Sequence, residues 1–270
     1  KISVITGASS GMGAAIALVL GQEYHLLITS SSEKKLEDTL ESLRGKGIAA
    51  DGVVCDVSQR DHVQSLAKEA EALGEIANVV NCAGVAPARS AAEKVFAINA
   101  MGTVYLTEAF FPIMKSGSVL INFSSTAPDS VPGIPIPTET LRMDPLKPEF
   151  LETNLELLRK LGEKGGGMAY IHSKWFVKDY SARSAARFGK KGVRIISISP
   201  GNILTPMYYN DAKATSDSML PKTPLGRHGR PEEVADVTAF LVSGKASFIT
   251  GVNIQIDGGL VAGITLPQLP

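Results

Sequence analysis

The chain has 270 residues, a length that suits one large domain or two small ones with an ample core. Its 27 Lys and Arg residues balance 27 Asp and Glu residues, so the chain has no excess positive charge to attract nucleic acid or an anionic membrane. Apolar residues make up 44% of the chain, yet no uninterrupted apolar run approaches the roughly 20 residues of a membrane span, and we expect a cytoplasmic protein without a signal segment.

The sequence alternates β-rich apolar runs with amphipathic helical stretches. In chain order, strands are predicted at residues 2–6, 24–29, 48–55, 76–82, 118–123, 193–199 and 252–256. Helices are predicted at residues 14–20, 33–46, 60–73, 92–115, 148–164, about 170–188, and 231–242. Repeated β-α units of this length predict one α/β domain over residues 1–270, with a doubly wound parallel sheet of about seven strands and helices on both faces.

A glycine-rich turn follows the first predicted strand directly. It joins that strand to a helix, so bare backbone amides and the helix dipole point at one place, as an anion site requires. Gly7 allows the turn, Gly11 lets a pyrophosphate approach, and Gly13 lets helix and strand touch. The alternative, an ordinary flexible loop, does not account for the position of the motif between strand and helix.

Polar residues recur near the predicted carboxyl ends of the strands. In an open parallel sheet, ligands bind beyond these ends. We therefore expect the following side chains to border one site: Ser10, Ser30, Asp56, Asn81 and Ser125.

Tyr170 and Lys174 are four residues apart and so lie one turn apart on one face of a helix. An ammonium near a phenol favours the phenolate, and we expect the pKa of Tyr170 to fall from its usual value of about 10. Such a tyrosine exchanges a proton with an alcohol or carbonyl oxygen as a general acid/base. Taken alone, the pair also fits a surface helix, since this spacing occurs by chance.

Residues 126–168 interrupt the β-α alternation. The proline-rich run 131–137 fits neither a central strand nor a helix, and Gly165-Gly166-Gly167 is expected to end the helix over 148–164. We expect this insertion and the loop over 202–225 to form a lid on the substrate side, which suits a bulky apolar ketone. Core packing is the alternative explanation for the apolar side of the 148–164 helix, which carries Phe150, Leu151, Leu155, Leu158 and Leu161.

In combination, the motifs resemble the short-chain dehydrogenase/reductase family along nearly the whole chain. The motifs, in order, are Thr6-Gly7-x-x-x-Gly11-x-Gly13, Asp56, Asn81-x-Ala83-Gly84, Asn99, Ser125, Tyr170-x-x-x-Lys174, Pro200-Gly201 and Asp257-Gly258-Gly259. Within the family, the chain is most similar to the bacterial 3α-hydroxysteroid dehydrogenase/carbonyl reductases. The shared features are the short interval between Gly84 and Asn99, the insertion over 126–168, the stretch over 166–170 and the C-terminal stretch over 257–270. Two departures are Cys82, where relatives usually have a second Asn, and the long interval between Ser125 and Tyr170.

This resemblance implies a Rossmann-like fold and reversible hydride transfer between a nicotinamide and a carbonyl/alcohol pair. It implies that Tyr170 protonates the carbonyl oxygen, that Lys174 lowers the tyrosine pKa and holds the nicotinamide ribose, and that Ser125 hydrogen-bonds the substrate oxygen. Asn99 resembles the asparagine that holds a water in a proton relay to Lys174. The implied cofactor-binding residues, besides Tyr170 and Lys174, are Gly7, Ser9, Ser10, Gly11, Met12, Gly13, Ser30, Ser31, Ser32, Asp56, Val57, Asn81, Ala83, Gly84, Pro200, Gly201, Ile203 and Thr205.

The end of the second strand is where the choice of cofactor is made. Relatives that prefer NAD usually carry an Asp there, whereas this chain reads Thr29-Ser30-Ser31-Ser32. Hydroxyls donate to a phosphate, and Lys34 or Lys35 is near enough to assist. We therefore predict NADP(H) rather than NAD(H), although the arginine of strong NADP binders is missing and an ordinary serine-rich turn is the alternative.

Two other functions remain open: a 3-oxoacyl thioester reductase of the same fold, and a non-catalytic NADP-binding regulatory protein. The long insertion counts against the first and the intact tyrosine–lysine pair against the second. We expect a small-molecule substrate, no nucleic-acid or membrane partner, and a homodimer or homotetramer. We also expect no metal, structural roles for His25, His62, His172, His228 and Trp175, reduced thiols at Cys55 and Cys82, and pocket positions for Met207 and Tyr208.

Overall fold

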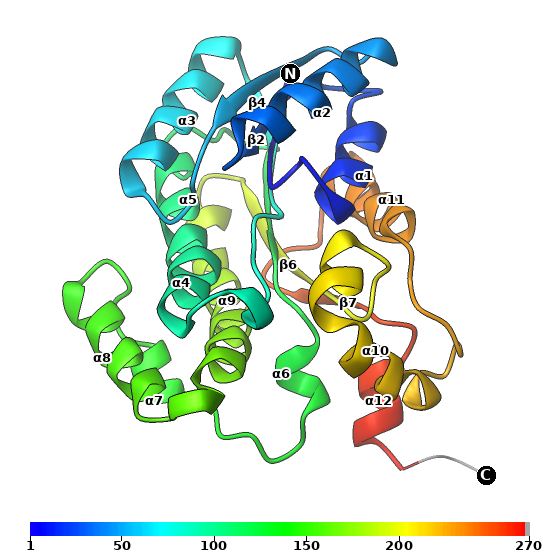
Figure 1. Ribbon diagram of the computed structural model, residues 1–270. Helices are drawn as coiled ribbons and strands as arrows, with labels where there is room; N and C mark the ends of the chain where they lie inside the picture. Colours follow the sequence, from blue (N-terminus) through cyan, green and yellow to red (C-terminus); the bar gives the residue numbers. More distant parts are fainter. Residues whose placement is uncertain (268–270) are drawn as a thin grey trace.

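One parallel β-sheet organises the protein, of which this computed structural model describes residues 1–267. Seven strands are ordered β3-β2-β1-β4-β5-β6-β7, which confirms the predicted fold class. The sheet stands between two layers of helices (Figure 1). The order reverses between β1 and β4, and ligands bind at such switch points in open α/β sheets. The strands are β1 (Ile2–Thr6), β2 (His25–Ser30), β3 (Ala50–Val54), β4 (Ile76–Asn81), β5 (Val119–Phe123), β6 (Arg194–Pro200) and β7 (Asn253–Ile256).

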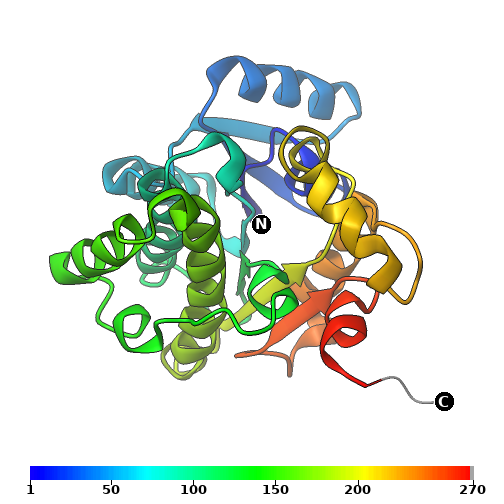
Figure 2. The same cartoon turned by 60° about the horizontal axis from the view of Figure 1, so that its bottom comes forward.

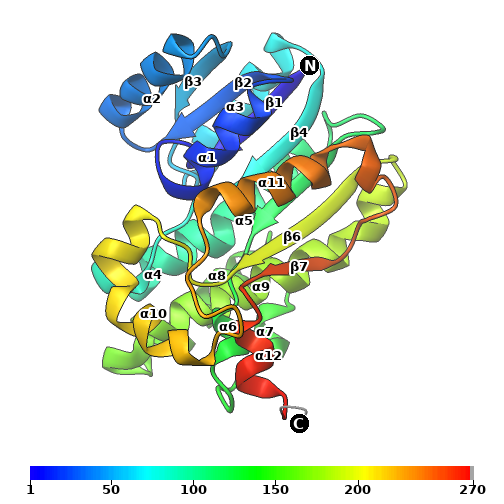
Figure 3. The same ribbon diagram turned by 90° about the vertical axis from the view of Figure 1, so that its right-hand side faces the viewer.

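Helices cover both faces of the sheet. One face carries α1 (Gly11–Leu20), α2 (Glu33–Gly45) and α11 (Pro231–Val242), and α1 and α11 run side by side (Figure 3). The other face carries α3 (Arg60–Leu73), α5 (Gly102–Phe110) and α9 (Gly165–Gly189). Among the helices of residues 1–267, none combines the length and the apolar character needed to cross a bilayer.

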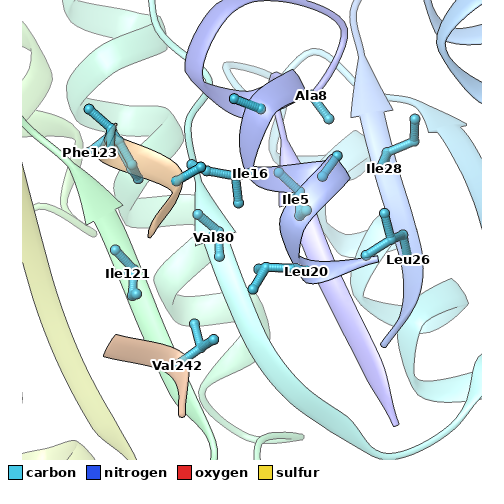
Figure 4. Close-up of a cluster of buried hydrophobic side chains, with 14 of the residues drawn as sticks. Ile5, Ala8, Ile16, Leu20, Leu26, Ile28, Val80, Ile121, Phe123 and Val242 are labelled. Carbon is cyan, nitrogen blue, oxygen red and sulfur yellow. The ribbon is translucent and has the colours of Figure 1, made fainter. Parts of the chain in front are cut away.

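Apolar side chains from adjacent strands form the core beneath α1. Ile5, Val80 and Ile121 come from β1, β4 and β5 and meet Ile16 and Leu20 of α1 (Figure 4). All five are 0–3% exposed, and burying each such side chain contributes about 1.5–3 kcal/mol. This packing fixes the start of α1, and with it the glycine-rich turn, against the carboxyl end of β1.

The long helical stretch predicted over 92–115 is present as far as Phe110, but it is not one regular α-helix. The structure has α4 (Ala92–Phe96), a π-helical turn (Ala97–Met101) and then α5. Asn99 lies in the wide turn, and its side chain bonds both backbone groups of Val85, accepting from the N–H at 2.9 Å and donating to the C=O at 3.1 Å. Such turns are frequent at functional sites because the extra residue redirects one side chain.

The insertion contains three short helices, of which only the last was predicted. They are α6 (Ala127–Ser130), α7 (Thr138–Leu141) and α8 (Pro148–Arg159), followed by a 3₁₀ turn (Gly162–Lys164). The three glycines do not end a helix as predicted, because they form the first turn of α9. A Cβ on Gly165 would lie 2.9 Å from the Leu158 carbonyl oxygen, so glycine lets the start of α9 touch the end of α8.

The apolar side of α8 packs inward, onto α4 and α9. The Phe150 ring lies 6.0 Å from the Phe96 ring and 5.2 Å from the Phe176 ring, measured between centroids. Leu158 is buried in the same cluster, with Leu151 and Leu155 partly buried against it. Core packing therefore explains these side chains of α8.

Residues 202–225, predicted as a loop, contain three helical segments. They are a π-helical turn (Tyr208–Ala212), α10 (Lys213–Met219) and a 3₁₀ turn (Leu220–Lys222). An unpredicted helix, α12 (Leu260–Thr265), contacts both that 3₁₀ turn and α6. Figure 2 shows green α6, yellow α10 and red α12 gathered at the end of the molecule where the strands finish. Short 3₁₀ turns also lie at Pro87–Arg89 and Gly244–Ala246.

Candidate active site

The glycine-rich turn between β1 and α1 leaves an anion cradle. Gly7 and Gly11 have φ values of +64° and +55°, in the left-handed region that favours glycine. A Cβ on Gly13 would lie 2.4 Å from the Gly7 carbonyl oxygen, so this contact also requires glycine. Ser10 precedes α1 without capping it through its side chain, and the first turn carries no acidic residue. The first amides of α1 can thus bind a pyrophosphate.

A cleft of about 320 Å³ opens beyond this turn and the ends of β2, β3 and β4. The predicted cofactor-binding residues that line it are Gly7, Ser9, Ser10, Gly11, Met12, Gly13, Ser30, Ser31, Ser32, Asp56, Val57, Ala83, Gly84 and Thr205. Lys35 and Met207, which were also considered from the sequence, line it too. Thr29, from the serine-rich stretch, lines the cleft as well. Sequence reasoning missed Cys55, Cys82, Val85, Ile98 and Pro206, of which Cys55 and Cys82 directly follow β3 and β4.

Besides Tyr170 and Lys174, which are described below, four predicted cofactor residues do not line this cleft. Asn81 is buried, accepts a hydrogen bond from Thr6 at 2.8 Å and donates to Asn122 at 3.1 Å, so it ties β1, β4 and β5 together. Ile203 packs in the core under α11. The other two, Pro200 and Gly201, lie at and just after the end of β6.

Ser125, Tyr170 and Lys174 converge at one end of the cleft. The Tyr170 phenol is hydrogen-bonded to the Ser125 hydroxyl. The Lys174 ammonium lies 5.9 Å from the centroid of the Tyr170 ring and donates to the Phe123 carbonyl at 2.8 Å. Gly84, which lines the cleft, connects the cleft with this cluster of three side chains.

Asn99 completes the cluster at Gly84. A Cβ on Gly84 would lie 3.2 Å from Asn99 Oδ1 and 3.4 Å from Lys174 Nζ. The glycine therefore keeps a narrow space between the cleft and the buried lysine. All four residues predicted to be catalytic are thus neighbours, although they come from the segment after β5, the π-helical turn and α9.

Burial dominates the electrostatics of this cluster. It raises the pKa of the Tyr170 phenol, and the hydrogen bond with Ser125 opposes that rise only in part. Burial also lowers the pKa of Lys174 to about 8. The expected fall in the tyrosine pKa is therefore not achieved by the chain alone, because the lysine ammonium is bonded to a carbonyl and is itself desolvated.

Lys174→Met is expected to change how stability depends on pH. The folded chain releases the Lys174 proton near pH 8, whereas the unfolded chain holds it to about 10.5. Between these values the unfolded state binds more protons, so the free energy of unfolding of the wild type rises with pH relative to that of the variant. Urea unfolding of both proteins from about pH 7 to 10.5 measures this, and parallel curves would contradict it.

The serine-rich end of β2 has one lysine facing the cleft and one facing away. Lys34 pairs with Asp38 at 3.3 Å and is 84% exposed, whereas Lys35 lines the cleft. Ser9 donates to Ser30 at 3.0 Å, and Ser32 accepts from the Lys35 amide at the start of α2. A cationic side chain and several hydroxyls therefore border this end of the cleft.

The remaining residues considered from the sequence have local partners. The Tyr208 hydroxyl donates a hydrogen bond to the Asp217 carboxylate at 2.6 Å, and His228 Nε2 contacts the same carboxylate at 3.0 Å. The His172 ring bonds the backbone of Pro135, and burial lowers the pKa of His172. His25 contacts Asp51, and His62 accepts a hydrogen bond from the Asp56 amide. The Trp175 ring lies under the Arg142 guanidinium. Both cysteines are free thiols, and burial raises the pKa of Cys55 to about 11.

Family models and known proteins match the chain along its length. Residues 1–135 match the model described as short chain dehydrogenase, and residues 157–261 match the one described as Enoyl-(Acyl carrier protein) reductase. The 3-oxoacyl-acyl-carrier-protein reductase of Thermotoga maritima is 31% identical over 97% of this chain and 98% of its own length. The 3-alpha-hydroxysteroid dehydrogenase/carbonyl reductase of Comamonas testosteroni is 28% identical over 97% of both chains.

The fold also matches solved structures. A short chain dehydrogenase from Burkholderia cenocepacia, solved in complex with NADP, has a TM-score of 0.77 and 22% identity, over 96% of both chains. The resemblance inferred from the motifs is therefore confirmed by models and relatives that span the chain. The chain belongs to the short-chain dehydrogenase/reductase family and is a nicotinamide-dependent oxidoreductase.

Proposed function

We propose that the protein is an NADP(H)-dependent carbonyl reductase and alcohol dehydrogenase for a bulky, apolar ketone or secondary alcohol, steroid-like or aromatic. The observation that carries this proposal is the convergence of Ser125, Tyr170 and Lys174 at one end of a cleft with an anion cradle. Such a site positions a carbonyl beside a dinucleotide and supplies a proton to its oxygen.

The bound nicotinamide supplies the hydride chemistry. In carbonyl reduction, Tyr170 gives its phenolic proton to the substrate oxygen, while Ser125 donates a hydrogen bond to the same oxygen. Lys174 holds the nicotinamide ribose and favours the phenolate that proton transfer leaves behind. Asn99 shapes the wall beside Lys174 through its bonds to Val85, and the proton relay through it remains a prediction.

Three exposed apolar side chains support an apolar substrate. Val131 of the insertion is 37% exposed, Tyr209 is 61% exposed and Leu225 is 64% exposed. These residues belong to segments at the end of the molecule where the strands finish, and a bulky apolar ligand would remove such surface from water. We propose that the insertion 126–168 contributes to a lid there through α6 and residues 131–137.

A substrate screen tests the proposal. NADPH oxidation would be followed with ketosteroids, aromatic ketones, quinones and an acetoacetyl thioester, with Tyr170→Phe as the inactive control. We expect turnover of ketosteroids or aromatic ketones. Turnover of the thioester alone would favour the 3-oxoacyl reductase alternative, which the 31% identical Thermotoga maritima relative supports. NADPH binding without any turnover would favour the regulatory alternative.

Lys35→Met is expected to weaken the preference for NADPH. Lys35 lines the cleft beside the serines, and an ionic hydrogen bond from its ammonium to a 2′-phosphate would be worth about 1.5–3 kcal/mol. We therefore expect kcat/KM for NADPH to fall about tenfold or more and kcat/KM for NADH to change little. Lys34→Met is the matched control, because Lys34 faces Asp38. A wild-type preference for NADH would contradict the proposed cofactor.

We propose a homodimer or homotetramer, as is common in the family, and light scattering at several protein concentrations measures the mass. The two free cysteines fit a reducing compartment such as the cytosol.

A further inference from the structure

Two contacts tie the segment around Ser125 to helix α9. The Ser124 hydroxyl, in a residue that is 5% exposed, donates to the Lys174 backbone carbonyl at 2.6 Å. Five residues after Ser124, both carboxylate oxygens of Asp129 lie 2.6 Å from the Lys178 ammonium. Ser125 therefore lies between two attachments to the helix that carries Tyr170.

The attachment points follow the turns of α9. Tyr170, Lys174 and Lys178 are spaced by four residues, which places them on one stripe of the helix. The Asp129–Lys178 pair is partly shielded, with side-chain exposures of 34% and 17%. Like Tyr170 and Lys174, Lys178 therefore points toward the segment that begins at Ser125.

Helix α6 depends on such external contacts. It has four residues, which is too short for a helix to be stable on its own. Its beginning is fixed by the bond from the Thr126 amide to the Pro200 carbonyl at 3.1 Å. Its third residue is Asp129, so the ion pair with Lys178 fixes the other end.

We propose that Asp129 and Lys178 are a positioning pair that, together with Ser124, holds the Ser125 hydroxyl against the Tyr170 phenol. This inference rests on the proposed function, because that function assigns the roles of Ser125 and Tyr170. The pair also couples the insertion to the chemistry, since a displacement of α6 changes the position of Ser125. Loss of the Ser125 hydrogen bond removes the contact that offsets part of the rise in the tyrosine pKa on burial.

The kinetic test compares Lys178→Met and Asp129→Asn with the wild type. Displacing a positioning group by about 1 Å costs up to about a hundredfold in rate, so we expect kcat to fall about 10–100-fold while KM for NADPH is unchanged. Arg142→Met is the matched control: Arg142 bonds Asp179 at 2.8 Å and also joins the insertion to α9, yet it does not hold Ser125. We expect that variant to keep its kcat.

A pH profile separates positioning from a general loss of structure. In alcohol oxidation Tyr170 must be deprotonated, so a higher tyrosine pKa moves the rising limb of kcat to higher pH in Lys178→Met. The exchanged double variant Asp129→Lys/Lys178→Asp restores the attraction and is expected to move the limb back. A limb that stays in place in Lys178→Met, with kcat near the wild-type value, would overturn the inference.

Hydrogen exchange distinguishes this inference from the proposed function, because it needs no turnover. The Thr126 and Asp129 amides are bonded to Pro200 and Thr126 carbonyls, and we expect faster exchange at both in Lys178→Met than in Arg142→Met. If the wild type reduced no carbonyl, the proposed function would fail while faster exchange still supported the attachment. Equal exchange rates of these amides in the two variants would show that the Asp129–Lys178 pair does not hold the segment.

Discussion

Tyr170→Phe is expected to abolish measurable carbonyl reduction, with kcat lower by about a hundredfold to ten-thousandfold, the range that a positioned general acid contributes. The variant keeps the aromatic ring and loses the oxygen that contacts Ser125. Tyr170 does not line the main cleft, so the dissociation constant of NADPH should stay near the wild-type value. Steady-state kinetics and fluorescence titration with NADPH measure the two quantities.

Tyr180→Phe is the control for this experiment. Tyr180 lies on the same helix, and its hydroxyl donates to Glu108 at 2.6 Å, away from Ser125. Its loss removes one buried hydrogen bond and should leave kcat largely unchanged. Near-normal turnover in Tyr170→Phe would remove the proposed mechanism.

Phe150→Ala is expected to lower the free energy of unfolding by about 3–5 kcal/mol, the usual cost of deleting a buried phenylalanine side chain. Phe150 is 0% exposed and packs between Phe96 of α4 and Phe176 of α9. The truncation leaves a cavity between the insertion and the helix that carries Tyr170. Urea denaturation followed by circular dichroism measures the change.

Leu146→Ala is the matched control for the insertion. Leu146 lies in the same segment but is 52% exposed, so its truncation should change the unfolding free energy by less than about 0.5 kcal/mol. A loss of less than about 1 kcal/mol in Phe150→Ala would mean that the insertion does not unfold together with the rest of the domain.

Much of the fold was predictable from the sequence, because buried parallel strands are continuous apolar runs and turns have characteristic residues. Helices α3 and α11 match their predicted bounds, and Pro231 marks the start of α11. The start of α9 was missed, because the contact between Gly165 and the Leu158 carbonyl overrides the weak helical preference of glycine. The π-helical turn was missed because its extra residue leaves the apolar pattern almost unchanged.

At the site, residue types were predictable and side-chain directions were not. The glycine turn and the serines of β2 are local in sequence, so their place in the cleft could be predicted. The spacing of Tyr170 and Lys174 puts them on one helix face, but it does not show that the ammonium reaches the Phe123 carbonyl. Which of Lys34 and Lys35 faces the cleft depends on how α2 is rotated against the sheet, which sequence spacing does not specify.

The aromatic contact between α8 and its neighbours limits how the segment could be exchanged between relatives. Phe150 belongs to the insertion, whereas Phe96 and Phe176 belong to the flanking framework. A chimera that transplants residues 126–164 alone would bring one ring without its two partners. Exchange of this region by recombination therefore requires matched changes on both sides of it, even though its outer surface is free to diverge.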